Sequence, residues 1–140
     1  MTEARSRPTP PAAGPGLAEA AARLAAIVDS SNDVIVSKTL DGIITSWNPA
    51  AERMFGWTAA EAIGRPITLI VPEAQRAEED DVLARVRRGE RVEHFDTVRV
   101  TKDRRLVDVS ITVSPVRDSA GRIVGASKIA RDIGERRRIE

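Results

Sequence analysis

Three segments near the C-terminus, in which apolar and polar residues alternate, constrain the fold more than any other feature of this sequence. They cover about residues 91–101, 105–115 and 122–131. In the second segment, polar residues separate Val107, Val109, Ile111 and Val113. A period of two is typical of strands that bury one face. Because short charged turns join the segments, we expect three long antiparallel strands in one sheet.

The residues before these strands predict a shorter hairpin and a series of helices. Residues 33–47 hold two apolar runs around a turn, which indicates a pair of strands. Asn48-Pro49 is a helix start, because Asn is a good N-cap and Pro suits the first helical position. Residues 73–88 predict a longer helix, since acids crowd its first half and arginines its end.

The N-terminus has a different composition. Residues 1–16 hold four of the eight prolines, and we expect a disordered tail there. Residues 17–29 are alanine-rich and predict a helix whose apolar residues recur at helical spacing. This stripe consists of Leu17, Leu24, Ile27 and Val28. The helix either packs on its own domain or pairs with a second copy. We expect a homodimer, because a helix this short is marginal by itself.

Composition excludes several classes of function. The 140 residues include no cysteine, which excludes disulfides, thiolate catalysis and cysteine-ligated metals. One histidine, His94, is too few for a multi-histidine metal site. The balance of 22 basic and 21 acidic side chains argues against a dedicated nucleic-acid binder, and Arg136–Arg138 suit a solvated helix face.

No segment predicts insertion into a membrane or secretion. No apolar run approaches the roughly 20 residues that cross a bilayer, and the N-terminus lacks the apolar stretch of a signal peptide. We therefore expect one cytoplasmic domain that binds or signals. An enzyme would have to use His94 with Asp96, or the acids of residues 78–81, and no nucleophile or cofactor motif accompanies either group.

The order of these elements, and a set of short motifs in sequence, resemble the PAS family. The resemblance extends from about Ala25 to Arg138. Its motifs are Asp41-Gly42-Ile43-Ile44, Trp47-Asn48-Pro49-Ala50-Ala51-Glu52, Phe55-Gly56-Trp57, Lys102-Asp103, Val113-Ser114-Pro115-Val116-Arg117-Asp118, Gly121-Arg122-Ile123-Val124-Gly125 and Ala130-Arg131-Asp132-Ile133. Each motif is weak by itself, but their common order is specific for the family.

The resemblance implies an α+β fold. Its core would be a five-stranded antiparallel sheet with short helices cupping one face, over residues 30–133. The N-terminal helix would flank this domain, and residues 134–140 would begin an exit helix.

The function that this resemblance implies is sensory. The domain would relay a conformational signal through Asp132, Ile133 and Gly134 to an output domain, such as a histidine kinase or a cyclic-dinucleotide synthase. The alternative is a stand-alone PAS protein that binds a small anionic ligand or a partner protein. Neither hypothesis requires an enzyme activity.

The family's cofactor positions are occupied by unsuitable residues in this chain. The cysteine of the light-sensing flavin members corresponds to Ile67, and their strand asparagine to Val109. The iron-ligating histidine of the heme members corresponds to Glu79, and His94 lies beyond that helix. We therefore expect no heme, no covalent flavin adduct and no metal. A small organic acid or non-covalent FAD remains open.

By analogy with flavin-binding relatives, nine residues would line the family's cavity. They are Ile67, Leu69, Phe95, Thr97, Arg99, Val109, Ile111, Val113 and Ser127. Arg99 is the unusual member, because a buried guanidinium is costly without a partner. It must reach water, pair with an acid such as Glu93 or Asp96, or meet an anionic ligand.

Overall fold

The computed structural model describes residues 10–134, with only the backbone described over residues 10–17. The chain divides after Ser30 into an N-terminal helical unit and a second unit that contains the sheet. The six residues after Gly134, which include Arg136–Arg138 and most of the expected exit helix, lie outside the described part.

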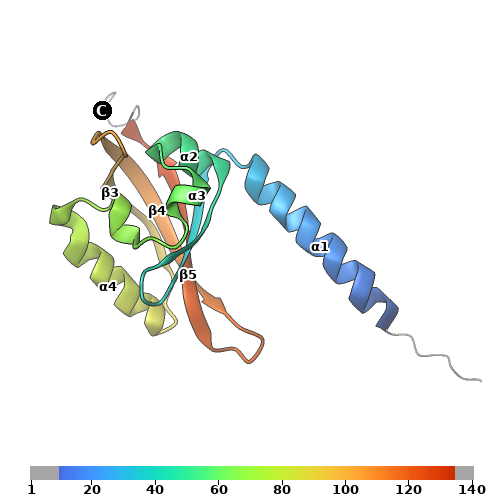
Figure 1. The fold of residues 1–140 in the computed structure, drawn as a ribbon. Coiled ribbons are helices and arrows are strands. Elements are labelled where there is room, and N and C mark those ends of the chain that lie inside the picture. Colours follow the sequence, from blue (N-terminus) through green and yellow to red (C-terminus); the bar gives the residue numbers. More distant parts are fainter. Residues whose placement is uncertain (1–9, 135–140) are drawn as a thin grey trace, which may run out of the picture. The chain divides into compact units, whose positions relative to one another are not determined.

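The second unit is built on a five-stranded antiparallel sheet with the strand order β2-β1-β5-β4-β3 (Figure 1). Its strands are β1 Val34–Thr39, β2 Ile44–Trp47, β3 Val92–Val100, β4 Leu106–Arg117 and β5 Ile123–Asp132. The last strand in sequence therefore lies in the middle of the sheet. It pairs with β1 on one side and with β4 on the other.

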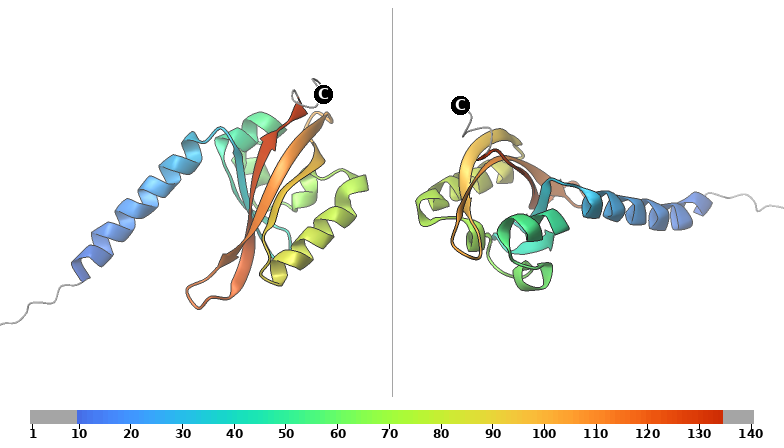
Figure 2. Two further views of the ribbon diagram at one scale, coloured as in Figure 1. Left: turned by 180° about the vertical axis from the view of Figure 1, so that it is seen from behind. Right: turned by 90° about the horizontal axis from the view of Figure 1, so that it is seen from above.

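The helical elements between β2 and β3 cover one face of this sheet (Figure 2). They are α2 Pro49–Phe55, α3 Ala59–Ala62, the 3-10 turns η2 Ile67–Ile70 and η3 Glu73–Gln75, and α4 Arg76–Arg87. Asn48, at the predicted start of α2, also connects α2 to β1. The Asn48 side chain accepts a hydrogen bond from Ala51 N as an N-cap, and another from Ile35 N of β1 at 3.0 Å. The core forms between these helices and the inner face of the sheet.

The fold predicted from the sequence is confirmed, including the N-terminal helix. Its bounds differ, because α1 spans Pro10–Ser30 and not residues 17–29. The expectation of disorder over residues 10–16 is therefore wrong. Pro10 and Pro11 occupy the first turn, where a missing N–H costs nothing, and alanines continue the helix. Residues 1–9 lie outside the described part.

Candidate functional site

A small cavity lies between the inner face of the sheet and the helices that cover it. Its volume is about 20 Å³, which is room for about one water molecule. The wall comprises Val34, Val36, Phe55, Ile67, Ile70, Arg99, Ile111, Lys128 and Ala130. All of these except Arg99 and Lys128 are apolar, and the two polar residues both carry hydrogen-bond donors.

Beside this cavity, three cationic side chains converge on Glu79 of α4. Glu79 is only 4% exposed. Its Oε1 accepts a hydrogen bond from Lys128 Nζ of β5 at 2.6 Å, and its Oε2 pairs with Lys38 Nζ of β1. Arg99 Nη2 of β3 lies 3.7 Å from Oε1. A single buried carboxylate thus links one helix to three strands of the sheet.

Glu78, the preceding residue of α4, contacts the other terminal nitrogen of the Arg99 guanidinium. Arg99 Nη1 lies 3.3 Å from Glu78 Oε1 and donates a 2.8 Å hydrogen bond to the carbonyl oxygen of Val98. Thr97 Oγ1 donates to the same carboxylate at 2.8–2.9 Å. We call Lys38, Glu78, Glu79, Arg99 and Lys128 the ionic cluster. When all five groups are charged, its cations outnumber its carboxylates by one (3 − 2 = 1).

Burial changes the titration of these cations. It lowers the pKa of Lys38 to about 6, with smaller contributions from the neighbouring Lys128 and Arg99. It lowers the pKa of Lys128 to about 7, with Arg99 as the next cause. Burial also lowers the pKa of Arg99, although Glu78 opposes that shift. The two lysines therefore change charge near neutral pH, while the guanidinium stays protonated.

The nine residues predicted for the cavity fall into three groups in the structure. Ile67, Arg99 and Ile111 line it. Thr97, Val109 and Val113 are buried on the same face of the sheet, and Leu69 and Phe95 are half-buried. Ser127 lies on the opposite face.

The prediction for Ser127 is wrong by one residue in the strand. Lys128 pairs across the sheet with Val36 and Val113, which both face the core, so Lys128 faces the core as well. Ser127 pairs instead with Ser37 and Ser114 on the outer face. A shift of one residue moves a side chain to the other face of a sheet.

The predicted acid partners of Arg99 are also wrong. Arg99 pairs with Glu78 and Glu79 of α4, and not with Glu93 or Asp96 of its own strand. Asp96 is an odd number of residues from Arg99 and so lies on the other face of β3. Glu93 lies within the register shift between Val92 and Phe95, and pairs with Arg91 at 3.7 Å.

Sequence reasoning missed Lys38, Lys128 and both glutamates as parts of one site. A signal for the lysines was present. Lys38 follows Val34 and Val36 at two-residue spacing, and Lys128 lies between Ala126 and Ala130 at the same spacing. A lysine in the apolar phase of a strand predicts a buried charge that needs a carboxylate.

His94 lies apart from this site. It is exposed at the register shift of β3, where its backbone has a φ of 48°. Its backbone N–H donates to Thr112 Oγ1 at 3.2 Å. Across residues 10–134, the structure contains no group of three or more histidine, aspartate and glutamate side chains arranged to hold a metal ion.

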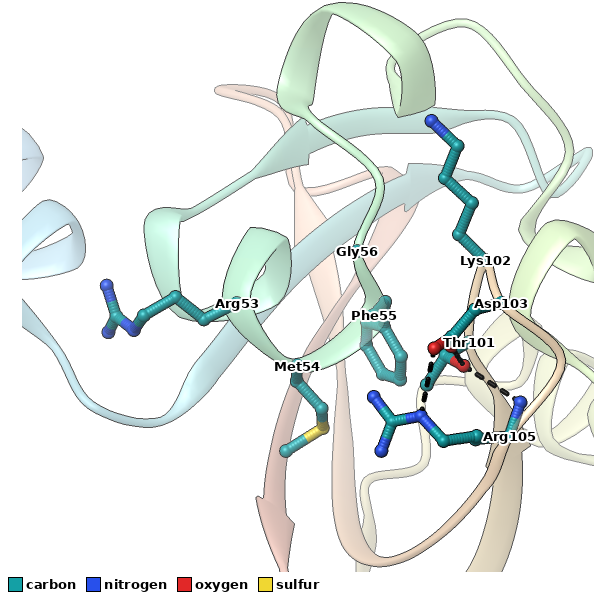
Figure 3. Close-up of a pocket in the computed structure, with 8 residues that line it drawn as sticks. All are labelled: Arg53, Met54, Phe55, Gly56, Thr101, Lys102, Asp103 and Arg105. Atoms are coloured by element: carbon teal, nitrogen blue, oxygen red, sulfur yellow. Dashed lines mark hydrogen bonds and ion pairs between the residues drawn. The ribbon is translucent and has the colours of Figure 1, made fainter.

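A second pocket lies on the surface, between α2 and the β3–β4 turn (Figure 3). Its volume is about 360 Å³. Three of its four charged side chains, all except Arg53, have an ionic partner in the described part of the chain, which leaves little free charge in the pocket. Arg105 Nε donates to Asp103 at 3.0 Å, and Lys102 Nζ donates to Glu61 at 2.8 Å and lies 5.1 Å from the Trp57 ring centre. The ionic cluster, with its buried titratable side chains on three strands, is therefore the better candidate for a functional site.

The expected relay residues follow directly from β5. Asp132 is its last residue and pairs with Val109 of β4. Ile133 is buried, and its N–H donates to the carbonyl oxygen of Asp108 at 3.0 Å. The Asp132 carboxylate accepts a 2.8 Å hydrogen bond from Gly134 N. The end of β5 is thus bonded to the sheet, and the Asp132 carboxylate holds the backbone N–H of Gly134.

A comparison with known families decides the identity of this fold. The family model described as the PAS fold matches residues 22–133. The chain belongs to the PAS family. Among solved structures, the PAS domain of a Colwellia psychrerythraea protein is 26% identical, with a TM-score of 0.75, and the match covers 83% of this chain and 98% of that one.

Two curated relatives of this PAS domain are bacterial signalling proteins. The sensor protein FixL of Bradyrhizobium diazoefficiens is 36% identical over 64 residues, which are 46% of this chain and 13% of FixL. The signal transduction histidine-protein kinase AtoS of Escherichia coli is 27% identical over 114 residues, or 76% of this chain and 18% of AtoS. The chain thus matches less than a fifth of either relative. In its described part, no helix is long and apolar enough to cross a membrane.

The residues at the family's cofactor positions do not fit heme or a flavin adduct. Glu79, at the position of the heme-ligating histidine, is bound by Lys38 and Lys128. Ile67, at the position of the flavin-linked cysteine, is a buried part of the cavity wall. A cavity of about 20 Å³ is also far smaller than either cofactor.

Proposed function

We propose that this PAS domain is a sensory module that couples its cavity to an output domain such as a histidine kinase or a cyclic-dinucleotide synthase. The observation that carries the proposal is the position of Lys128. It contributes to the ionic cluster from β5, the same strand that ends at Asp132 and Ile133. The similarity to a sensor protein and a histidine kinase supports the proposal.

The coupling would run through the middle of the sheet. A change in the charge of Glu79, or a ligand that binds next to it, alters the attraction between Glu79 and its two lysine partners. These are Lys128 on β5 and Lys38 on the neighbouring strand β1. Because β5 pairs with β1 and with β4, a displacement of β5 alters both of its strand interfaces. Ile133 and Asp132 then transmit the displacement into the segment that follows.

A fusion to a histidine kinase catalytic core tests this proposal. We expect Lys128→Met to change the autophosphorylation rate by about fivefold or more, which is the lower range of allosteric coupling. The matched control is Lys102→Met, which removes an exposed lysine from a surface ion pair. Adding Ile133→Ala to Lys128→Met should cancel most of the change, because it loosens the end of β5.

The activity measurement requires that each variant is folded, and circular dichroism checks this. Equal rates for the unmodified fusion and for folded Lys128→Met would contradict the proposal. A change of the same size in Lys102→Met would also contradict it, since that lysine lies outside the ionic cluster.

A further inference from the structure

We propose that the ionic cluster is a proton-operated switch, in which acid breaks the contacts of Lys38 and Lys128 with Glu79 and loosens β1 and β5 from α4. The inference rests on the proposed sensory function, and it names a fall in pH as the input that the domain senses.

The first argument is that three cationic side chains share one buried carboxylate. Lys38, Arg99 and Lys128 are 2%, 1% and 5% exposed, and all three contact Glu79. With both lysines neutral, the carboxylate balances the guanidinium, which does not lose its proton. Each proton that a lysine then accepts adds a positive charge in a region shielded from water, and such a charge is costly.

Besides Glu79, two acids and Arg99 are the charged groups that act on the lysines in the described part of the chain. Glu78 of α4, whose side chain is 32% exposed, favours the charged form of Lys128, and the exposed Asp80 favours that of Lys38. Arg99 of β3 opposes both. Desolvation by burial outweighs the acids, so the pKa is about 6 for Lys38 and about 7 for Lys128. The neighbouring α2, η2 and β4 contribute apolar residues to the adjoining cavity, namely Phe55, Ile67, Ile70 and Ile111.

The second argument is that a state in which the two amines reach water binds protons more readily than the closed cluster. A solvated lysine has a pKa of 10.5, whereas the values in the closed cluster are about 6 and about 7. A fall in pH between 10.5 and these values therefore shifts the population toward the state with solvated amines. The shift is complete near pH 6, so the cluster stays closed at alkaline pH and opens in acid.

The third argument is the position of the two lysines in the sheet. Lys38 is on β1 and Lys128 is on β5, and these two strands pair with each other. Both lysines bind the same carboxylate of α4, so its loss as a partner releases two neighbouring strands from one helix. Because β5 ends at Asp132 and is followed by the buried Ile133, the opening reaches the residues that precede the output segment.

The test follows the ¹⁵N nuclear magnetic resonance signals of the full chain from pH 8.5 to pH 5.5. We expect the amide signals of Lys38, Lys128 and Ile133 to move with a common midpoint at or above about pH 6, while the spectrum keeps the dispersion of a folded domain. The same titration in His94→Asn removes the side-chain type that ordinarily titrates in this range, and asparagine tolerates the positive φ of that position. Signals that stay in place, or a spectrum that only collapses to that of an unfolded chain, would overturn the proposal.

Lys38→Met/Lys128→Met removes both titrating amines, and Lys102→Met, which removes an exposed lysine, is the matched control. We expect the Ile133 shift to disappear in the double variant and to persist in Lys102→Met. An Ile133 shift of unchanged size in the double variant would overturn the proposal, because another group would then be the one that titrates. The side-chain ¹⁵N signals of the lysines in the unmodified chain need no variant, and amines of Lys38 and Lys128 that remain charged up to pH 8.5 would also overturn it.

The kinase fusion, measured at pH 8 and pH 6 relative to the fusion of the double variant, separates this proposal from the sensory function. If the lysines and Ile133 titrate as expected but neither pH nor Lys128→Met changes the activity, the switch stands and the sensory function is contradicted. If Lys128→Met changes the activity but the lysines do not titrate in this range, the sensory function stands and the proton is the wrong input.

Discussion

In this domain, two lysines on neighbouring strands share one buried carboxylate. Lys38 and Lys128 contact the two oxygens of Glu79, and each has a pKa well below its ordinary value of 10.5. Desolvation is the largest cause for both lysines, so the lysines favour their neutral forms in the folded state. At neutral pH these two lysines therefore bind fewer protons in the folded domain than in the unfolded chain.

We expect stability to rise with pH from about 6 upward. Between the folded-state pKa values, about 6 and 7, and 10.5, the unfolded chain binds more protons than the folded chain. The free energy of unfolding should therefore increase with pH, by at most about 1.4 kcal/mol per pH unit for each lysine. Urea unfolding at pH 6, 7, 8 and 9 measures the slope.

The control for this slope is the double variant Lys38→Met/Lys128→Met. It leaves Glu79 beside Arg99 and replaces both titrating groups with apolar side chains of similar length. Its slope should be much smaller. A stability that stays level or falls between pH 6 and 9 in the unmodified protein would show that the lysines do not titrate as their burial implies.

At the scale of elements, the close approach of β1 and β5 positions the ionic cluster. Gly125 of β5 pairs with Thr39 of β1, and a β-carbon added at Gly125 would lie 2.5 Å from the carbonyl oxygen of Lys38. No side chain fits there unless the strands move apart. The glycine therefore allows the backbone of Lys38 to pack directly against β5.

We expect Gly125→Ala to destabilise the domain by about 1–3 kcal/mol, as overpacking does in a tight interior. It should also displace Lys38, so the chemical shifts of the Lys38 ammonium and of Glu79 should change. The control is Val124→Ala, since Val124 is largely exposed next to the same position. Urea unfolding of both variants provides the comparison. An unchanged free energy for Gly125→Ala would mean that β1 and β5 can separate freely.

At the scale of the whole molecule, we propose that α1 mediates homodimer formation. Its stripe of Leu24, Ile27 and Val28 recurs at spacings of three and four residues, as in helices that pack against a partner. The segment after β5 is a weaker candidate for the dimer contact, because Ile133 and Ile139 are six residues apart and do not continue such a stripe.

Deleting residues 1–29 should therefore convert the protein to a monomer, while deleting residues 134–140 should not. Light scattering at tens of micromolar protein measures the molar mass of each. A monomeric full chain, or a dimer that survives the N-terminal deletion, would show that α1 is not the dimer contact.

Much of the fold could be predicted because its signals are local. The alternation around Val109 and Ile111 identifies a strand, and Asn48-Pro49 identifies the start of α2, without knowledge of any partner. The start of α1 predicted from the sequence is too late because prolines usually interrupt helices. Pro10 and Pro11 lie in the first turn of α1, and Pro15 is its sixth residue.

The candidate site depends on contacts that no local pattern contains. Lys128 and Glu79 are 49 residues apart, and the phase of β5 places Lys128 and not Ser127 on the inner face. The sequence by itself determined the elements, the PAS resemblance and the absence of a cysteine or a histidine at the cofactor positions. Only the tertiary structure decided which charges meet, because a buried lysine is stable only where the fold brings a carboxylate to it.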